Sequence, residues 1–174
     1  MLAAESAWRI LHAEHAQMRR LLERIEAMAA SPDWREPGPA LNSLARLVQR
    51  LQSFDDATHR PKGVALFAAL RGREADTDAL IQQLEADCGQ RDELLNEVLV
   101  RLKALQLGHR SAAEQAEKGL ARYAGLLRRD LDLEDSALHA DSAKLLAPEQ
   151  WSVIASSIST VMTHTASRRA PKTR

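Results

Sequence analysis

The sequence predicts an all-α protein, an up-down-up-down four-helix bundle with a short fifth helix at its C-terminal end. Three observations support this fold class. Apolar residues recur at alternating steps of three and four along most of the chain, as on one face of an α-helix. No segment shows the strict alternation of apolar and polar residues that is typical of a half-buried strand. Only 7 of the 174 residues are glycine, which favours long helices.

A proline-rich loop separates the first two predicted helices. The first helix carries its apolar stripe at positions 8, 11, 18, 22 and 25, and it ends before residues 31–39, which contain three prolines and a glycine. The second helix begins near Leu41. Its apolar pattern resumes with Val64 after Pro61, so we expect this proline to kink the helix rather than to end it.

Short turns separate the later helices, so consecutive helices should run antiparallel. The third helix follows residues 71–73 and ends at Gly108, because glycine suits the left-handed position after a helix. The fourth runs from Ser111 to about Leu138, and Pro148 begins the short fifth helix. Residues 1–165 therefore form the predicted bundle domain, and the basic, apolar-poor residues 166–174 form a predicted disordered tail.

The composition excludes several classes of partner. Lys and Arg together number 24, as do Asp and Glu, so the formal net charge is zero and nothing favours nucleic acid or a membrane surface. No stretch approaches the roughly 18 apolar residues of a membrane span, and the N-terminal residues lack a signal-peptide pattern. The single cysteine allows no intramolecular disulfide. We expect a cytoplasmic protein whose partner is another protein or a second copy of the chain.

Each of the four long helices interrupts its apolar stripe with a polar residue that is able to bind a metal ion. These residues are His15 in the first helix, His59 in the second, Cys88 in the third, and Asp130 and Glu134 in the fourth. Counting residues from each one to the nearest turn places most of them at similar heights along the bundle axis. Inward carboxylates and histidines on facing helices are the usual components of a metal site in a helical bundle. The sequence therefore predicts one polar layer inside the bundle.

Two segments carry a resemblance to a known family. LHAEHAQMRRLLERIE, residues 11–26, and FDDATHRPKGVALFAAL, residues 54–70, resemble the first and second helices of the hemerythrin-like (HHE cation-binding) domain family. The resemblance covers roughly residues 5–160 and implies a four-helix bundle that binds iron among its inward side chains. It implies metal ligands at five positions, namely His15, His59, Cys88, Asp130 and Glu134.

The chain departs from the family's pattern at several of these positions. The family has a glutamate four residues after the histidine of the second helix, where this chain has Gly63. It has histidines at the positions of Cys88 and Asp130. The resemblance therefore does not imply an oxygen-carrying di-iron centre, because the ligands that match the pattern are only His15, His59 and Glu134.

Two interpretations of this degenerate centre remain open, and a third is disfavoured. In the first, which we favour, the centre binds no metal and the protein is a binding or regulatory module. In the second, the remaining ligands bind a single Fe²⁺ or Zn²⁺ ion, and the module senses iron, oxygen or redox state. Oxygen-activating catalysis would need more intact ligands, so we predict that the protein is not an enzyme.

Arg91 provides a specific version of the metal-free interpretation. It lies one helical turn after Cys88 on the third stripe, and helical side chains lean toward the N-terminus of their helix. Its guanidinium group should therefore reach the height of Asp130 and Glu134. Because buried carboxylates without a counter-charge are costly, we predict that Arg91 neutralises both of them.

Overall fold

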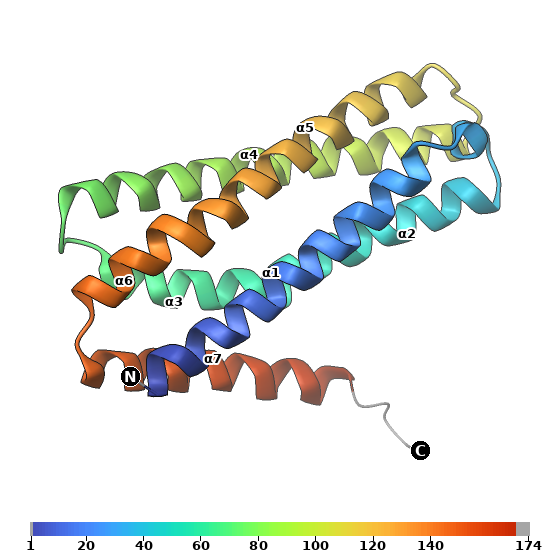
Figure 1. Ribbon diagram of the computed structural model, residues 1–174. Helices are drawn as coiled ribbons and strands as arrows, with labels where there is room; N and C mark the ends of the chain where they lie inside the picture. The colour runs from blue at the N-terminus through green and yellow to red at the C-terminus, as the bar shows by residue number, and fades with distance from the viewer. Residues whose placement is uncertain (1, 170–174) are drawn as a thin grey trace.

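The computed structural model describes the backbone of residues 2–169 and the side chains of residues 2–160 (Figure 1). This part of the chain is helical and contains no strand, which confirms the predicted fold class. Its elements, in order, are α1 (Leu2–Ala29), η1 (Pro32–Arg35), α2 (Pro39–Phe54), η2 (Asp55–His59), α3 (Arg60–Leu70), α4 (Ala75–Gln106), α5 (Ala112–Leu133), η3 (Glu134–Leu138), α6 (His139–Leu145) and α7 (Pro148–Arg169).

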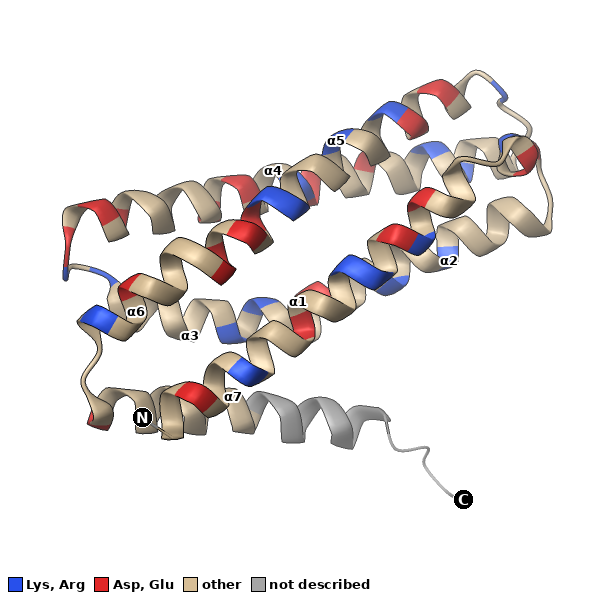
Figure 2. Cartoon of the chain, in the orientation of Figure 1, with Lys and Arg blue, Asp and Glu red and all other residues tan. Residues whose placement is uncertain are grey.

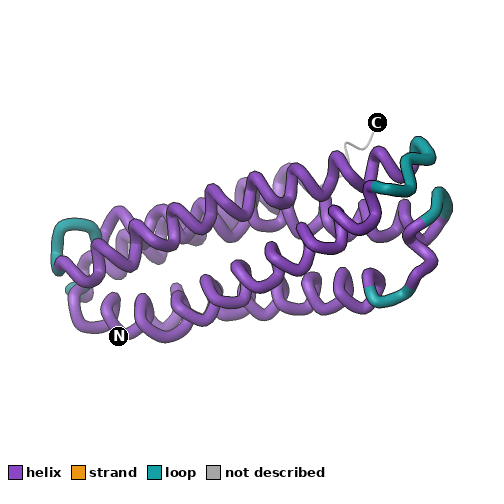
Figure 3. The backbone as a smooth tube through the Cα atoms, turned by 90° about the horizontal axis from the view of Figure 1, so that it is seen from above, coloured by secondary structure: helices purple, strands orange, loops and turns teal. Residues whose placement is uncertain are grey.

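Four long helical units run back and forth along the molecule, as the sequence predicts. The first unit is α1, the second is α2 with α3, the third is α4, and the fourth is α5 with α6 (Figure 1). Successive units are antiparallel, and the connecting loops lie at the two ends of the bundle (Figure 3). Helix α7 then runs back along α1 and α3.

Gly108 ends the third unit as predicted. Its φ angle of 91° lies in the left-handed region, and its N–H group donates to the carbonyl of Leu105. The N–H group of His109 donates to the carbonyl of Ala104, which completes a Schellman motif and satisfies carbonyl groups at the helix end. The chain can therefore reverse at once into α5, which packs along α4.

The C-terminal helix differs from the prediction. Helix α7 contains 22 residues and is therefore not short. Its apolar face packs against α1 and α3 through Trp151, Ile154 and Ile158, and this packing stabilises the helix. It also includes residues 166–169, which the sequence assigns to a disordered tail. No proline occurs there before position 171, and each residue added to an existing helix gains a backbone hydrogen bond. Residues 170–174 lie outside the described part, and the domain boundary at residue 165 stays a prediction. The fourth unit also extends beyond Leu138, to Leu145.

Two apolar clusters fill the interior, with buried polar residues between them along the chain. On α1, Leu11 belongs to one cluster and Met18 to the other, and Glu14 and His15 are buried between the two. The other helical units show the same order. Their buried polar residues between the clusters are Asp55, His59, Lys62, Arg91 and Glu134. A polar layer therefore crosses the bundle.

Two of the four units contain a π-helical turn at the level of the polar layer. One turn, η2, lies between α2 and α3, and the other, η3, lies between α5 and α6. Pro61 follows two residues after η2, and the helix continues past it into α3, so this proline does not end the second unit. Such π-helical turns inside α-helices are frequent at functional sites.

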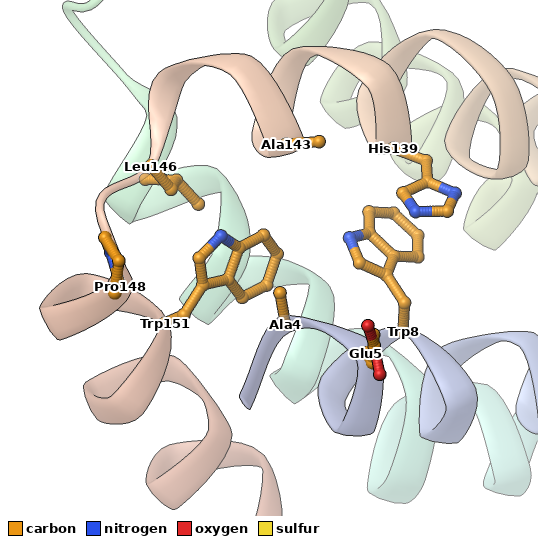
Figure 4. A pocket seen from close by; sticks show the side chains of 8 residues that line it. All are labelled: Ala4, Glu5, Trp8, His139, Ala143, Leu146, Pro148 and Trp151. Carbon is orange, nitrogen blue, oxygen red and sulfur yellow. The ribbon is translucent and has the colours of Figure 1, made fainter. Parts of the chain in front are cut away.

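A cavity of about 440 Å³ lies at the end of the bundle where α1, α6 and α7 meet (Figure 4). Trp8 and Trp151 stand on opposite sides of it. Both side chains are almost fully buried, and the ring of Trp8 also stacks on His139 and donates through Nε1 to Ser142. The two tryptophans therefore serve mainly to pack this end of the bundle.

Charged residues are not separated by sign on the bundle. Figure 2 shows acidic and basic positions interspersed along the long helices, in keeping with the formal net charge of zero. Within the described residues, no helix combines the length and the apolar content that crossing a membrane requires.

Candidate metal centre

Three buried side chains from three helical units converge in the polar layer. His15 comes from α1, His59 from the end of η2, and Glu134 from the start of η3. The two imidazole Nε2 atoms lie 2.9 Å apart, and Oε2 of Glu134 lies 3.4 Å from Nε2 of His15 and 3.6 Å from Nε2 of His59. All three residues are buried, so these three atoms face one another rather than solvent.

An aspartate binds the other nitrogen of each imidazole ring. Nδ1 of His15 lies 2.6 Å from Oδ1 of Asp135, and Nδ1 of His59 lies 3.2 Å from Oδ1 of Asp55. Burial acts to raise the pKa of both aspartates, but the hydrogen bonds and charges of the histidines and of nearby arginines together outweigh it and lower the pKa of each. Both aspartates are therefore ionised acceptors, and each Nδ1 atom carries a proton and donates it.

The Nε2 atoms of the neutral rings would then carry only lone pairs, directed at each other and at the Glu134 carboxylate. Such an arrangement needs a positive charge among the three acceptors. Burial acts to lower the pKa of both histidines, but the neighbouring carboxylates raise the pKa of His15 and raise that of His59 to about 10. Burial acts to raise the pKa of Glu134, but the two histidines hold it well below its usual range. The cluster is thus built around a proton or a metal ion.

The spacing of the three atoms suits a metal ion. The point equidistant from them lies about 1.9 Å from each, close to the ~2.0–2.2 Å at which Zn²⁺ is bound by imidazole nitrogen and carboxylate oxygen. Two imidazoles and one carboxylate are the protein ligands of several catalytic zinc sites and of mononuclear non-haem iron sites. Metal-bound histidines also usually donate their second N–H group to a carboxylate or carbonyl. The residues present therefore fit a single divalent ion.

The other two predicted ligands lie outside this group. Cys88 is half-buried on α4 and lines a cavity that His59 also lines, and burial raises the pKa of its thiol. Asp130 is buried on α5, and burial raises its pKa to about 7 even though Arg91 acts to lower it. The structure brings three of the five predicted ligands together, and metal binding by any of them stays a prediction.

Arg91 contacts only one of the two carboxylates that the sequence led us to pair with it. Its Nε atom lies 3.2 Å from Oδ2 of Asp130, and both side chains are buried, but neither atom is aligned for a hydrogen bond. Glu134 is paired with His15 and His59 instead. Asp130 therefore faces α4, whereas Glu134 faces α1 and η2.

A buried ion pair fixes α1 against the second helical unit beside the two histidines. Nζ of Lys62, a fully buried residue, donates to Oε1 of Glu14 and to the backbone carbonyl of Thr58. Glu14 directly precedes His15, and Thr58 directly precedes His59. The Lys62 side chain thus joins the two backbone segments that carry the imidazole rings.

Sequence reasoning gives no role at this centre to Asp55 or Asp135. A signal exists for Asp55, because an acid four residues before a histidine on a helix lies on the same face, and His59 follows at that spacing. No such signal exists for Asp135. It adjoins Glu134, and an ordinary α-helix would turn it about 100° away from the inward stripe. In the structure both aspartates lie in π-helical turns.

A cavity of about 130 Å³ lies beside the centre, between α3 and α4. His59 and Glu134 line it, together with Gly63 and Arg91. A Cβ atom on Gly63 would meet no atom nearer than Cζ of Phe67, at 4.0 Å, so the glycine leaves open space. At the position where the family has a glutamate, this chain therefore has a glycine that lines a cavity.

The fold and the centre define a class of protein: a four-helix bundle with two buried histidines and one carboxylate, in which an aspartate orients each histidine. The sequence profile of the hemerythrin HHE cation binding domain matches residues 6–141, a range that contains every residue of this centre. The chain therefore belongs to the hemerythrin HHE cation-binding domain family. Comparison with curated proteins and with solved structures finds no match to the chain.

Proposed function

We propose that the protein is a cation-binding module that holds one divalent metal ion, iron or zinc, between His15, His59 and Glu134. One observation supports this proposal most directly. Three buried acceptor atoms face one another within 3.6 Å, and a carboxylate orients each imidazole through its other nitrogen. Membership of the hemerythrin family, whose members usually bind iron, supports the same function.

The proposed centre is mononuclear. Gly63 provides no carboxylate, and Cys88 and Asp130 lie outside the converging group. Three protein ligands leave coordination positions open, as in catalytic or exchangeable sites rather than closed structural ones. A bound metal would supply Lewis acidity there and, in the case of iron, one-electron chemistry. We propose a role in binding and sensing, not in turnover.

Metal analysis of protein purified without an affinity tag tests the proposal. Protein that is stripped with a chelator and titrated with Zn²⁺ or, without oxygen, with Fe²⁺ should bind one ion per chain. Glu134→Gln and His59→Gln should each weaken binding by about tenfold or more, because each replaces a carboxylate or imidazole ligand by a neutral amide that binds these ions weakly. His109→Gln, in an exposed turn, is the matched control and should leave the affinity unchanged.

Binding that neither ligand substitution weakens would place the ion elsewhere and refute this centre. If the folded protein binds no stoichiometric metal, the metal-free interpretation is correct, and a proton on His59 takes the place of the ion beside His15 and Glu134. Absorption bands of an oxo-bridged iron pair would show that the centre is dinuclear.

A further inference from the structure

The cavity of about 130 Å³ between α3 and α4 extends from the surface to the polar layer. Val64 and Glu85, which line it, are exposed, whereas His59 and Glu134, which also line it, are buried. Gly63 forms part of its wall without contributing a side chain. An engineered cavity of about 150 Å³ in another protein holds a benzene molecule, so this volume suits a ligand of a few non-hydrogen atoms.

Two arginines that line this cavity carry hydrogen-bond donors without acceptors. Arg91 is only 6% exposed, and its Nε and Nη1 atoms are buried with no hydrogen-bond partner. Both Nη atoms of Arg60 donate to Asp92, but its Nε atom is also buried without a partner. Because an unpaired buried N–H group is costly, a small shift of either guanidinium group toward an acceptor atom in the cavity would be favourable.

The charges around the cavity favour an anionic ligand at Arg91. Each lining carboxylate already has a cationic partner, and these pairs are Asp55 with Arg60, Glu85 with Arg71, and Glu134 with His59. Among the described residues, Arg91 forms its ion pair with Asp130, which does not line the cavity, although the charge of Asp55, which does line it, also acts on the guanidinium group.

We infer that this cavity binds a small planar oxyanion, with a monocarboxylate such as acetate as its chemical type. The planar guanidinium group of Arg91 matches two carboxylate oxygens, and the space beside Gly63 accommodates the rest of the ligand. The inference deepens the proposed function, because the anion would lie beside His59 and Glu134. It rests on the proposed function only in that the neighbouring centre would hold a metal ion. The arginine donors are present whether or not a metal ion is bound.

Titration with sodium acetate against sodium chloride, at constant ionic strength, tests the inference. Chelator-treated and Zn²⁺-loaded protein are titrated separately, and bound acetate is detected by saturation-transfer NMR. Both forms should show saturable binding in the millimolar range. Arg91→Gln should weaken acetate binding by about tenfold or more, because it removes the positive charge and the paired N–H donors of the guanidinium group. Arg50→Gln, at an exposed position of α2 that does not line the cavity, should bind acetate like the wild type.

A second variant, Gly63→Gln, tests the inference even if the Arg91→Gln protein does not fold. It fills the cavity with a neutral side chain, leaves the Arg91–Asp130 pair in place, and should abolish acetate binding. Undiminished binding in folded Arg91→Gln or Gly63→Gln protein would overturn the inference. So would the absence of saturable binding by the wild type up to about 100 mM acetate, a concentration well above that at which an anchored charge-assisted pair should form.

Zn²⁺ affinity separates the two proposals. Neither variant removes a proposed metal ligand, so both should bind Zn²⁺ within about threefold of the wild type. Arg91-dependent acetate binding by a protein that binds no metal would support the anion site and refute the proposed function. Stoichiometric Zn²⁺ binding without acetate binding would support the proposed function and refute the anion site.

Discussion

The Nε2 atoms of His15 and His59 lie 2.9 Å apart, while the other ring nitrogen of each histidine is hydrogen-bonded to an aspartate. A neutral imidazole has one proton, and in both rings the aspartate retains it on Nδ1. Neither neutral ring can then donate to the other, so the pair requires an added proton or a metal ion. Protons and metal ions therefore compete for the same place, beside Glu134.

The aspartates behind the two rings should control metal affinity. Asp135→Asn and Asp55→Asn should each weaken Zn²⁺ binding by about tenfold to a hundredfold, because the ring loses an anionic acceptor that makes Nε2 more basic. Calorimetric titration of chelator-treated protein measures this. Asp132→Asn is the matched control, since Asp132 shares Arg19 with Asp135 but does not contact His15. An equal loss in this control would attribute the effect to Arg19 or to net charge.

The free energy of unfolding of the metal-free protein should fall as the pH rises from about 6.5 to about 10. Despite burial, Glu134 and Asp55 raise the pKa of His59 from 6.5 to about 10 in the folded protein. The folded state thus binds this proton more tightly than the unfolded chain does. The resulting stabilisation is complete below pH 6.5 and is lost as the pH rises through 10. Urea unfolding at several pH values measures it.

Two comparisons assign this pH dependence to the centre. His59→Gln removes the titrating group and should flatten the curve. Protein saturated with Zn²⁺ should also show a flatter curve, because metal binding displaces the proton. Stability that increases with pH over this range in the metal-free wild type would contradict the prediction.

The buried pair of Arg91 and Asp130 should be strongly coupled only when the carboxyl group is ionised. Near pH 8.5, Arg91→Ala should cost on the order of 3 kcal/mol, because it leaves a buried carboxylate unpaired. The cost should be much smaller in an Asp130→Asn background. Since burial raises the pKa of Asp130 to about 7, the coupling should shrink at about pH 5, where the group is neutral. Urea unfolding of the wild type, the two single variants and the double variant measures this coupling. Additive losses of stability at the higher pH would exclude the interaction.

Two helical glycines should respond in opposite ways to alanine. Gly63→Ala should stabilise the protein by about 0.5–1 kcal/mol, because alanine has the higher helix propensity and its Cβ would lie 4.0 Å from the nearest atom, Cζ of Phe67. Gly119→Ala gains the same propensity, but its Cβ would lie 2.7 Å from Cγ2 of Val98, so it should destabilise. Thermal unfolding of both variants decides this. A loss of stability in Gly63→Ala would show that the space beside this residue is not open.

The helical architecture could be predicted from sequence because it depends on local relationships. Apolar residues at helical spacing marked the inward face of each unit, and the left-handed conformation required after α4 explains Gly108. The length of α7 differs from the prediction, because the polar composition of residues 166–169 gave no indication that a helix anchored by Trp151 would continue through them.

By itself, the sequence determined that His15, His59 and Glu134 lie on inward helical stripes, and the family profile agrees with the bundle that carries them. Only the tertiary structure decided that their three acceptor atoms meet, that Asp55 and Asp135 orient the two rings, and that Arg91 pairs with Asp130. The reason is physical. The depth and rotation of one helix against another depend on the packing of the whole core, and the π-helical turns η2 and η3 shift the local period at this layer.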